Sequence, residues 1–562
     1  MDSGISMTAA VSLVPATLAE KFPPDRPAVG YGVHRVVGLE TEFGIHAPAQ
    51  PQASHSVMSL ELINAYGHKL AGQGTNVAST EWDYNEESPL SDARGWQLPR
   101  SIAHPTQLTD QSLVSAQGQQ LHMLVNLILP NGARFYVDHA HPEYSSPETT
   151  NPVDAVIWDQ AGDRIAQQAA DHIAAADDAA EILLYKNNTD NKSVSYGAHE
   201  NYLVARELDF DELTEHILGF FTTRQIITGA GRVGIGSLNE KAGFQISQRA
   251  DFFEEEVGLE TTIRRPIVNT RDEPHATPES YRRLHVIIGD ANLSQYSTWL
   301  RVGMTSLVLS MIELGELPMV ELAEPVQALQ DISHDPTLQK QVLVNGRGWM
   351  TAIEIQWMYQ RAAREYIDRY GIEDQQTVDV VNAWAEVLEL LDRDPAQLAD
   401  RLDWVAKYQL LNGMRQRHGL EWSNAKLAML DLQWADLREN KGLYYTLVSR
   451  GAMRTIVSEE QIQHAIAMPP TTTRAWTRGR LIDRFGAHLA GVSWESVLLR
   501  PFRTGPVQRF YLLEPLAATA EEINGLLAAN KPQLTLEDTA ANRETITQLI
   551  QQLQPYRVSG RS

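Results

Sequence analysis

The chain has 562 residues, no cysteine and a formal net charge of −24. The absence of cysteine excludes disulfides, thiol catalysis and cysteine-ligated zinc, and it fits a reducing cytoplasm. The negative charge argues against general nucleic-acid binding, which needs a basic surface. No apolar run reaches the roughly 18 residues of a membrane-spanning helix, so we expect no membrane segment.

The chain opens with a stretch that has no clear pattern, residues 1–33. It lacks the basic start of a signal peptide, so we expect a disordered N-terminal extension. Residues 35–45 then alternate like a strand, with Gly38, Glu40 and Glu42 on one face. Two carboxylates so close are costly unless a cation lies between them, and hard oxygen ligands suit Mg²⁺. The alternative is a solvent-facing edge strand.

A long polar stretch follows at residues 72–118, and it carries Trp82 and Trp96. Loops of this length inside a compact domain are usually functional or disordered. We expect a long loop between two strands.

The next strand precedes Pro142, which cannot donate to a sheet and should end it. The strand places three polar side chains on one face: Arg134, Tyr136 and Asp138. Glu143 would lie just past the strand end. A cation, a phenol and two carboxylates would form the wall of a polar pocket. The alternative is a half-exposed strand with ordinary polar residues.

Later strands repeat this arrangement of ionisable residues two positions apart. The further pairs are His199 with Asn201, Ser247 with Arg249, and Arg283 with His285. A lone histidine on a strand is more often structural than a ligand. Together, however, these side chains are the set needed to hold metal ions and a polyphosphate. We therefore predict that the pairs line one site.

The second half of the chain is mainly helical, by the spacing of its apolar residues. Helices are predicted over 153–175, 293–314, 348–369, 376–391 and 395–411, with largely helical structure over 425–466. A small α+β domain should follow, with helices at 478–489, 518–529 and 537–554 and strands at 493–499 and 507–513. The predicted class is α+β, with a large domain at 34–465 and a small C-terminal domain at 466–562.

Long motifs in these segments resemble the Pup ligase/deamidase family. They are GLETEFG at 38–44, YVDHAHPEY at 136–144, SYGAHENY at 195–202, NTRDEPH at 269–275 and RLHVIIGDAN at 283–292. The family shares its fold with glutamine synthetases, so the resemblance implies a curved, mostly antiparallel sheet backed by helices. Residues 72–118, and His139-Ala140, resemble the deamidase/depupylase branch. The ligase branch lacks that loop.

The resemblance implies an ATP- and Mg²⁺-dependent amidohydrolase. Such an enzyme deamidates the C-terminal glutamine of the small protein Pup to glutamate and cleaves the isopeptide bond between Pup and substrate lysines. Its partners would be Pup and pupylated proteins, and indirectly the bacterial proteasome pathway.

The resemblance also implies roles for individual residues. Asp138 would be the catalytic carboxylate, and Arg249 would position phosphate or the carboxyl end of Pup. The metal ligands would be Glu40, Tyr136, Glu143, His199 and His285. The nucleotide would contact Gly38, Leu39, Glu40, Thr41, Glu42, Ser145, Ser146, Asn201 and Arg283.

Chemistry read from the residues agrees that a carboxylate is the natural catalyst, because the chain has no cysteine and no nucleophile-elbow serine motif. Asp138 could attack the amide directly or deprotonate a water held by Mg²⁺, and both routes stay open. The nearest alternative function is a Pup–protein ligase, against which the 72–118 loop argues. More distant alternatives are a glutamate–amine or glutamate–cysteine ligase, an inactive Pup-binding module and a zinc hydrolase, for which no H-E-x-x-H motif is present.

Overall fold

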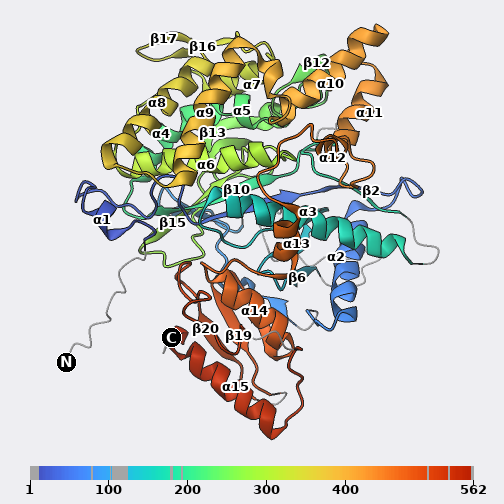
Figure 1. Ribbon diagram of the computed structural model, residues 1–562, viewed down its shortest axis with the longest axis vertical. Helices are drawn as coiled ribbons and strands as arrows, with labels where there is room; N and C mark the ends of the chain where they lie inside the picture. Colours follow the sequence, from blue (N-terminus) through green and yellow to red (C-terminus); the bar gives the residue numbers. More distant parts are fainter. Residues whose placement is uncertain are drawn as a thin grey trace.

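The computed structural model describes residues 12–77, 80–101, 103, 125–176, 181–190, 194–502, 505–528 and 532–557. A six-stranded sheet lies at its centre (Figure 1). Its strands, in spatial order, are β15 (Tyr281–Val286), β10 (Ala198–Ala205), β1 (Val37–Glu42), β8 (His141–Ser145), β7 (Arg134–Asp138) and β6 (Asn126–Ile128). Every neighbouring pair is antiparallel. The predicted antiparallel sheet is therefore confirmed.

One face of this sheet is apolar, because side chains alternate between the two faces of a strand. The buried side chains on it are Leu39, Phe135, Tyr144, Tyr202 and Leu284. Helices α2 (His55–Gly72) and α3 (Pro152–Ala174) pack against this face. Tyr66 of α2 meets Phe135 edge to face with ring centres 6.2 Å apart. A Cβ at Gly162 of α3 would lie 2.3 Å from the Tyr144 ring, so this contact requires glycine.

A layer of helices lies beyond the sheet, at the top of Figure 1. It contains α4 (Phe210–Thr223), α5 (Gln225–Thr228), α6 (Gln295–Glu313), α7 (Pro325–Ser333), α8 (Ala352–Tyr370), α9 (Gln375–Arg393), α10 (Asp403–His418) and α11 (Ala425–Trp434). Every residue of α6 is buried, which makes it the core of this layer. Two further helices, α12 (Leu443–Ser449) and α13 (Glu459–Ala467), follow in the chain. Among the described residues, no helix combines the length and apolar character needed to cross a membrane.

Short two-stranded pairs lie outside the central sheet. They are β2 (Gly44–His46) with β9 (Leu183–Tyr185), β4 (Ser91–Asp92) with β5 (Trp96–Gln97), β11 (Arg232–Ile235) with β12 (Lys241–Gln245), β13 (Phe253–Gly258) with β14 (Arg265–Asn269), and β16 (Gln341–Val344) with β17 (Gly348–Thr351). Two of the predicted helices begin later than expected. Residues 348–351 form a hairpin strand, and α10 starts only at Asp403, after a short 3₁₀ turn at Pro395–Leu398.

The expectation of disorder across residues 1–33 differs from the structure. Residues 1–11 lie outside the described part, but residues 12–33 include helix α1 (Ala16–Ala19) and pack on the protein core. Leu18 and Phe22 are buried, and the Phe22 ring meets Tyr370 of α8 edge to face at 5.0 Å. Burial of these widely spaced apolar side chains orders the segment.

The C-terminal part forms the small α+β unit at the bottom of Figure 1. It contains α14 (Ala475–Phe485), α15 (Ala540–Leu553) and a four-stranded sheet ordered β20 (Gln508–Tyr511), β19 (Ser496–Leu499), β18 (Leu489–Val492) and β3 (Glu81–Trp82). The last strand comes from the 72–118 stretch and pairs in parallel with β18. The helix predicted over 518–529 is wrong, because the described residues 518–528 form turns, with positive φ at Ala518 and Gly525.

Glu148 joins this unit to the central sheet. Its carboxylate accepts hydrogen bonds from Arg474 Nε at 2.8 Å and from Arg478 of α14. Burial alone would raise the pKa of the Glu148 carboxyl, but the two guanidinium groups lower it to about 2. The ion pair therefore favours the folded state above the ordinary glutamate pKa, and this stabilisation is lost as the pH falls toward 2.

We expect Glu148→Gln to flatten the acid side of the stability profile. The lowered pKa of Glu148 corresponds to about 3 kcal/mol of unfolding free energy. Wild type should lose this stabilisation between roughly pH 5 and pH 2, and the variant should not. Urea unfolding across this range measures it, with the exposed Glu389→Gln as the control. Parallel profiles for wild type and Glu148→Gln would contradict the assignment.

Candidate functional site

The polar face of the central sheet gathers most of the predicted site residues. They are Glu40, Glu42, Tyr136, Asp138, Glu143, Ser145, His199, Asn201, Arg283 and His285. The strand register sets their neighbours: Glu40 is paired with His199 on one side, and Glu42 with Glu143 on the other. Five strands thus present ionisable groups to one space, over a face whose reverse side is apolar.

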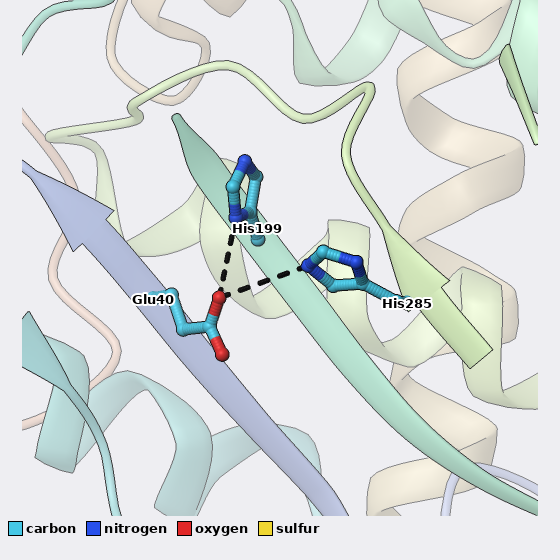
Figure 2. Close-up of side chains that lie close together, drawn as sticks. All are labelled: Glu40, His199 and His285. Carbon is cyan, nitrogen blue, oxygen red and sulfur yellow. Dashed lines mark hydrogen bonds and ion pairs between the residues drawn. The ribbon is translucent and has the colours of Figure 1, made fainter. Parts of the chain in front are cut away.

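Glu40, His199 and His285 form the first group, one residue from each of β1, β10 and β15 (Figure 2). Glu40 Oε2 lies 3.2 Å from His199 Nδ1 and 3.8 Å from His285 Nε2. Asn201 Nδ2 donates to the other Glu40 oxygen at 3.0 Å. Burial would raise the pKa of the Glu40 carboxyl, but the hydrogen bonds with the two histidines hold it well below its ordinary value. Glu40 is therefore an anion at neutral pH.

The second group consists of three carboxylates, Glu42, Asp138 and Glu143. Glu42 is fixed by the backbone N–H of Gly197, at 2.8 Å, and by His141 Nδ1, at 3.5 Å. Burial opposes the ionisation of Glu42, but the contact with His141 outweighs it and lowers the pKa to about 2. A Cβ at Gly197 would lie 2.3 Å from His199 Nε2 and 2.7 Å from Glu42 Oε1. A side chain at this position would therefore displace the His199 imidazole or the Glu42 carboxylate, where the two groups meet.

The charge balance of this face fits bound cations. Burial, followed by repulsion from Asp138, Glu40 and Glu42, raises the pKa of the Glu143 carboxyl well above its ordinary value. A cation between these oxygens would remove that repulsion. Three carboxylates are the hard donor set that Mg²⁺ prefers, whereas the group with two imidazoles also suits softer divalent ions.

Glu143 lies within a strand, and not just past the end of one as expected. The strand does end before Pro142, at Asp138, but a new strand, β8, begins at His141 and contains both Pro142 and Glu143. Tyr136 and Glu143 are directly opposed in this hairpin. Burial, and then the charge of Glu143, raise the pKa of the Tyr136 phenol well above its ordinary value. The phenol is therefore protonated and serves as a hydrogen-bonding neighbour of Glu143.

A cavity adjoins the first group at the start of β1. It is lined by Gly38, Leu39, Glu40, Ser145, Ser146, Asn201 and Arg283 of the predicted nucleotide set. Ser146 Oγ accepts a hydrogen bond from the Leu39 N–H at 2.9 Å, and Arg283 Nη1 donates to Asn201 Oδ1 at 2.5 Å. Thr41, Glu42 and Arg249 do not line this cavity. Thr41 alternates with Glu40 and Glu42 on β1, which places its side chain on the opposite face.

Sequence reasoning missed the far wall of the cavity. It is formed by Glu148, His275, Arg474, Trp494 and Pro515. Arg474 and Trp494 come from the C-terminal unit, more than 400 residues after β1 in the chain. No local pattern in the sequence connects them to the sheet.

Arg249 lies apart from the strand face expected for it, because β12 ends at Gln245. Its buried guanidinium donates to the Ile287 carbonyl and to Ser195 Oγ. Burial, then the nearby Arg265, lower the pKa of the Arg249 guanidinium to about 9. Two neighbouring buried guanidinium groups next to Glu42 form a positive region at the end of the polar face opposite the cavity.

The described part of the 72–118 stretch contacts the site wall. The Arg134 guanidinium lies 4.1 Å from the ring centre of Trp82 and 3.9 Å from that of Tyr136. Trp82 also meets Trp494 edge to face, with ring centres 5.2 Å apart. Residues 104–118 lie outside the described part. Trp82 therefore joins the wall at Tyr136 to the cavity wall at Trp494.

An antiparallel sheet with helices on its apolar face and acids and histidines on its polar face is the arrangement of the glutamine synthetase-like fold. Two solved structures share the fold. The complex between Pup and its ligase PafA is 29% identical, with a TM-score of 0.71, and the match covers 94% of this chain and 92% of that one. The Pup ligase PafA in complex with ADP is 34% identical, with a TM-score of 0.66, over 77% and 91%.

The family model described as Pup-ligase protein matches residues 35–498, and the chain belongs to this family. Among curated relatives, a depupylase of Acidothermus cellulolyticus is 50% identical over 88% of this chain and 97% of its own length. A Pup deamidase/depupylase of Mycolicibacterium smegmatis is 47% identical over 91% and 100%. A Pup–protein ligase of Nocardioides sp. is 42% identical over 64% and 80%.

Proposed function

We propose that this protein is a hydrolase that deamidates the C-terminal glutamine of Pup and cleaves the isopeptide bond between Pup and substrate lysines. The observation that carries the proposal is the contrast among relatives. The matches to depupylases span 88–91% of the chain at 47–50% identity, whereas the matches to two Pup–protein ligases cover 64–72% of it at 38–42%. Pup and pupylated proteins are the corresponding partners, and the cysteine-free chain suits the cytoplasm.

The cofactors we propose are ATP and Mg²⁺. A relative of the same fold is described in complex with ADP, and the cavity at Gly38–Glu40 offers backbone, hydroxyl, amide and guanidinium groups for a nucleotide. Glu40, His199 and His285 would hold one divalent ion, and Glu143, with Glu42 beside it, would hold another. Bound cations would supply charge stabilisation for the phosphates and for the developing oxyanion. Tyr136 remains a proposed additional ligand.

Asp138 is the residue we propose to act on the amide. Its side chain is 40% exposed, while the other carboxylates of the polar face are less exposed, so substrate can reach it. Asp138 could attack the amide carbon or take a proton from an attacking water. Arg249, with Arg265 beside it, would hold the carboxyl end of Pup or a phosphate, because a buried guanidinium pairs readily with such an anion.

The experiment that tests this function follows the intact mass of Pup. Purified protein is incubated with ATP, Mg²⁺ and Pup that ends in glutamine, and in parallel with a pupylated substrate. We expect the mass gain that accompanies replacement of an amide NH₂ by OH, and release of free Pup from the conjugate. ATP consumption with Pup joined to lysines would instead identify the ligase. No reaction in either assay would favour a binding module.

A further inference from the structure

The turn beside Asp138 has a histidine in an uncommon backbone conformation. Asp138 and His141 form the last pair of the β7–β8 hairpin, so His139 and Ala140 make a two-residue loop. His139 has a φ of 52°, in the left-handed region. Only a few per cent of residues other than glycine have a positive φ, and histidine is among the side chains, with asparagine and aspartate, that accept it most often. The position therefore admits a histidine, and the direction of its imidazole shows what it contacts.

The left-handed backbone brings the imidazole back onto the preceding residue. His139 Nδ1 lies 2.9 Å from Asp138 Oδ2, which is hydrogen-bond distance. The turn itself is held from outside the hairpin. Ser59 Oγ of α2 donates to the Ala140 carbonyl at 2.9 Å, and the Phe43 N–H donates to the Pro142 carbonyl at 2.9 Å. The hairpin therefore presents His139 to the carboxylate from a fixed backbone.

The carboxylate of Asp138 needs such a partner. The neighbouring Glu42 is fixed by a backbone N–H and a histidine, but Asp138 is the most exposed carboxylate of the polar face. A short, exposed side chain samples several rotamers, and an acting carboxylate must be held close to its productive geometry. With Oδ2 on His139, Oδ1 is left to face the amide or an attacking water.

We propose that His139 is a positioning residue that orients the Asp138 carboxylate for hydrolysis. This inference rests on the proposed catalytic role of Asp138. His139 does not touch the substrate. It contributes a hydrogen bond to Asp138 Oδ2, and its backbone adopts the positive φ of the turn. The strain of the turn is retained because it aims the imidazole at the carboxylate.

Three substitutions at position 139 separate the hydrogen bond from the backbone. Glycine, asparagine and aspartate all tolerate a positive φ, but only asparagine keeps a donor near Oδ2. We expect kcat for Pup deamidation to fall by about 10- to 100-fold in His139→Gly, with unchanged KM and melting temperature. His139→Asn should restore most of kcat. Aspartate has the size of asparagine but offers no donor, so kcat of His139→Asp should be as low as that of His139→Gly or lower.

The activities of these variants test the positioning role directly. Wild-type kcat in His139→Gly, or equal rates for His139→Asn and His139→Asp, would overturn the proposal, and the second comparison holds even if the glycine variant does not fold. Asp138→Asn with full activity would instead refute the catalytic role of Asp138. A crystal structure of a glycine or aspartate variant gives a readout independent of activity. We expect the Asp138 carboxylate to rotate or to occupy several conformers, and an unmoved carboxylate would overturn the positioning role.

Discussion

Replacing Asp138 with asparagine should abolish Pup deamidation and depupylation, with a fall in kcat of at least about 10³-fold. The amide of asparagine has the shape of the carboxylate, but it can neither attack a carbonyl carbon nor accept a proton from water. The side chain is only partly buried and caps no helix, so we expect the melting temperature to stay within a few degrees of wild type. Single-turnover mass spectrometry of Pup measures the loss directly.

The matched control is Asp368→Asn, which removes the same charge from an exposed position on α8. Nucleotide affinity gives a second check, because the cavity at the start of β1 does not include Asp138. An Asp138→Asn enzyme that retains its nucleotide affinity and loses hydrolysis would assign the residue to the chemical step. Hydrolysis within tenfold of the wild-type rate would move that role to another group, with Glu143 as the next candidate on the polar face.

The polar face was predictable because a strand has a side-chain period of two. Residues two apart, such as Glu40 and Glu42 or Arg283 and His285, must share a face whatever the rest of the chain does. That rule also gives the apolar reverse face, so most of the residues on the polar face followed from local patterns. The curved antiparallel sheet backed by helices was instead implied by the family resemblance. It failed for Arg249, because the strand ends four residues earlier and the rule no longer applies.

Contacts between distant segments were not predictable from local patterns. Trp82 pairs with a strand more than 400 residues later, and Arg474 and Trp494 complete a cavity whose other wall begins at Val36. Such contacts depend on how whole units dock, which no short-range periodicity encodes. The N-terminal segment shows the same limit, since Leu18 and Phe22 are too sparse to predict a helix and become ordered only against the assembled core.

The group of Glu40, His199 and His285 leads to the second large expected effect. Its only anion is Glu40, which stays ionised at neutral pH because the two histidines lower the pKa of its carboxyl. A divalent cation that binds there would lose most of its electrostatic attraction if this charge were removed. Burial lowers the pKa of the His285 imidazole well below its ordinary value, so this ligand contributes no negative charge.

We therefore expect Glu40→Gln to weaken divalent-cation binding about 100-fold or more while the sheet stays folded, because glutamine keeps the size of the side chain and its hydrogen bond with Asn201. Titration of Mn²⁺ followed by electron paramagnetic resonance measures affinity and stoichiometry without substrate turnover. Glu42→Gln serves as the comparison within the site, since it alters the carboxylate group and leaves the histidine group intact. The exposed Glu389→Gln controls for a change in net charge. Unchanged Mn²⁺ affinity and stoichiometry in Glu40→Gln would show that this group holds no cation.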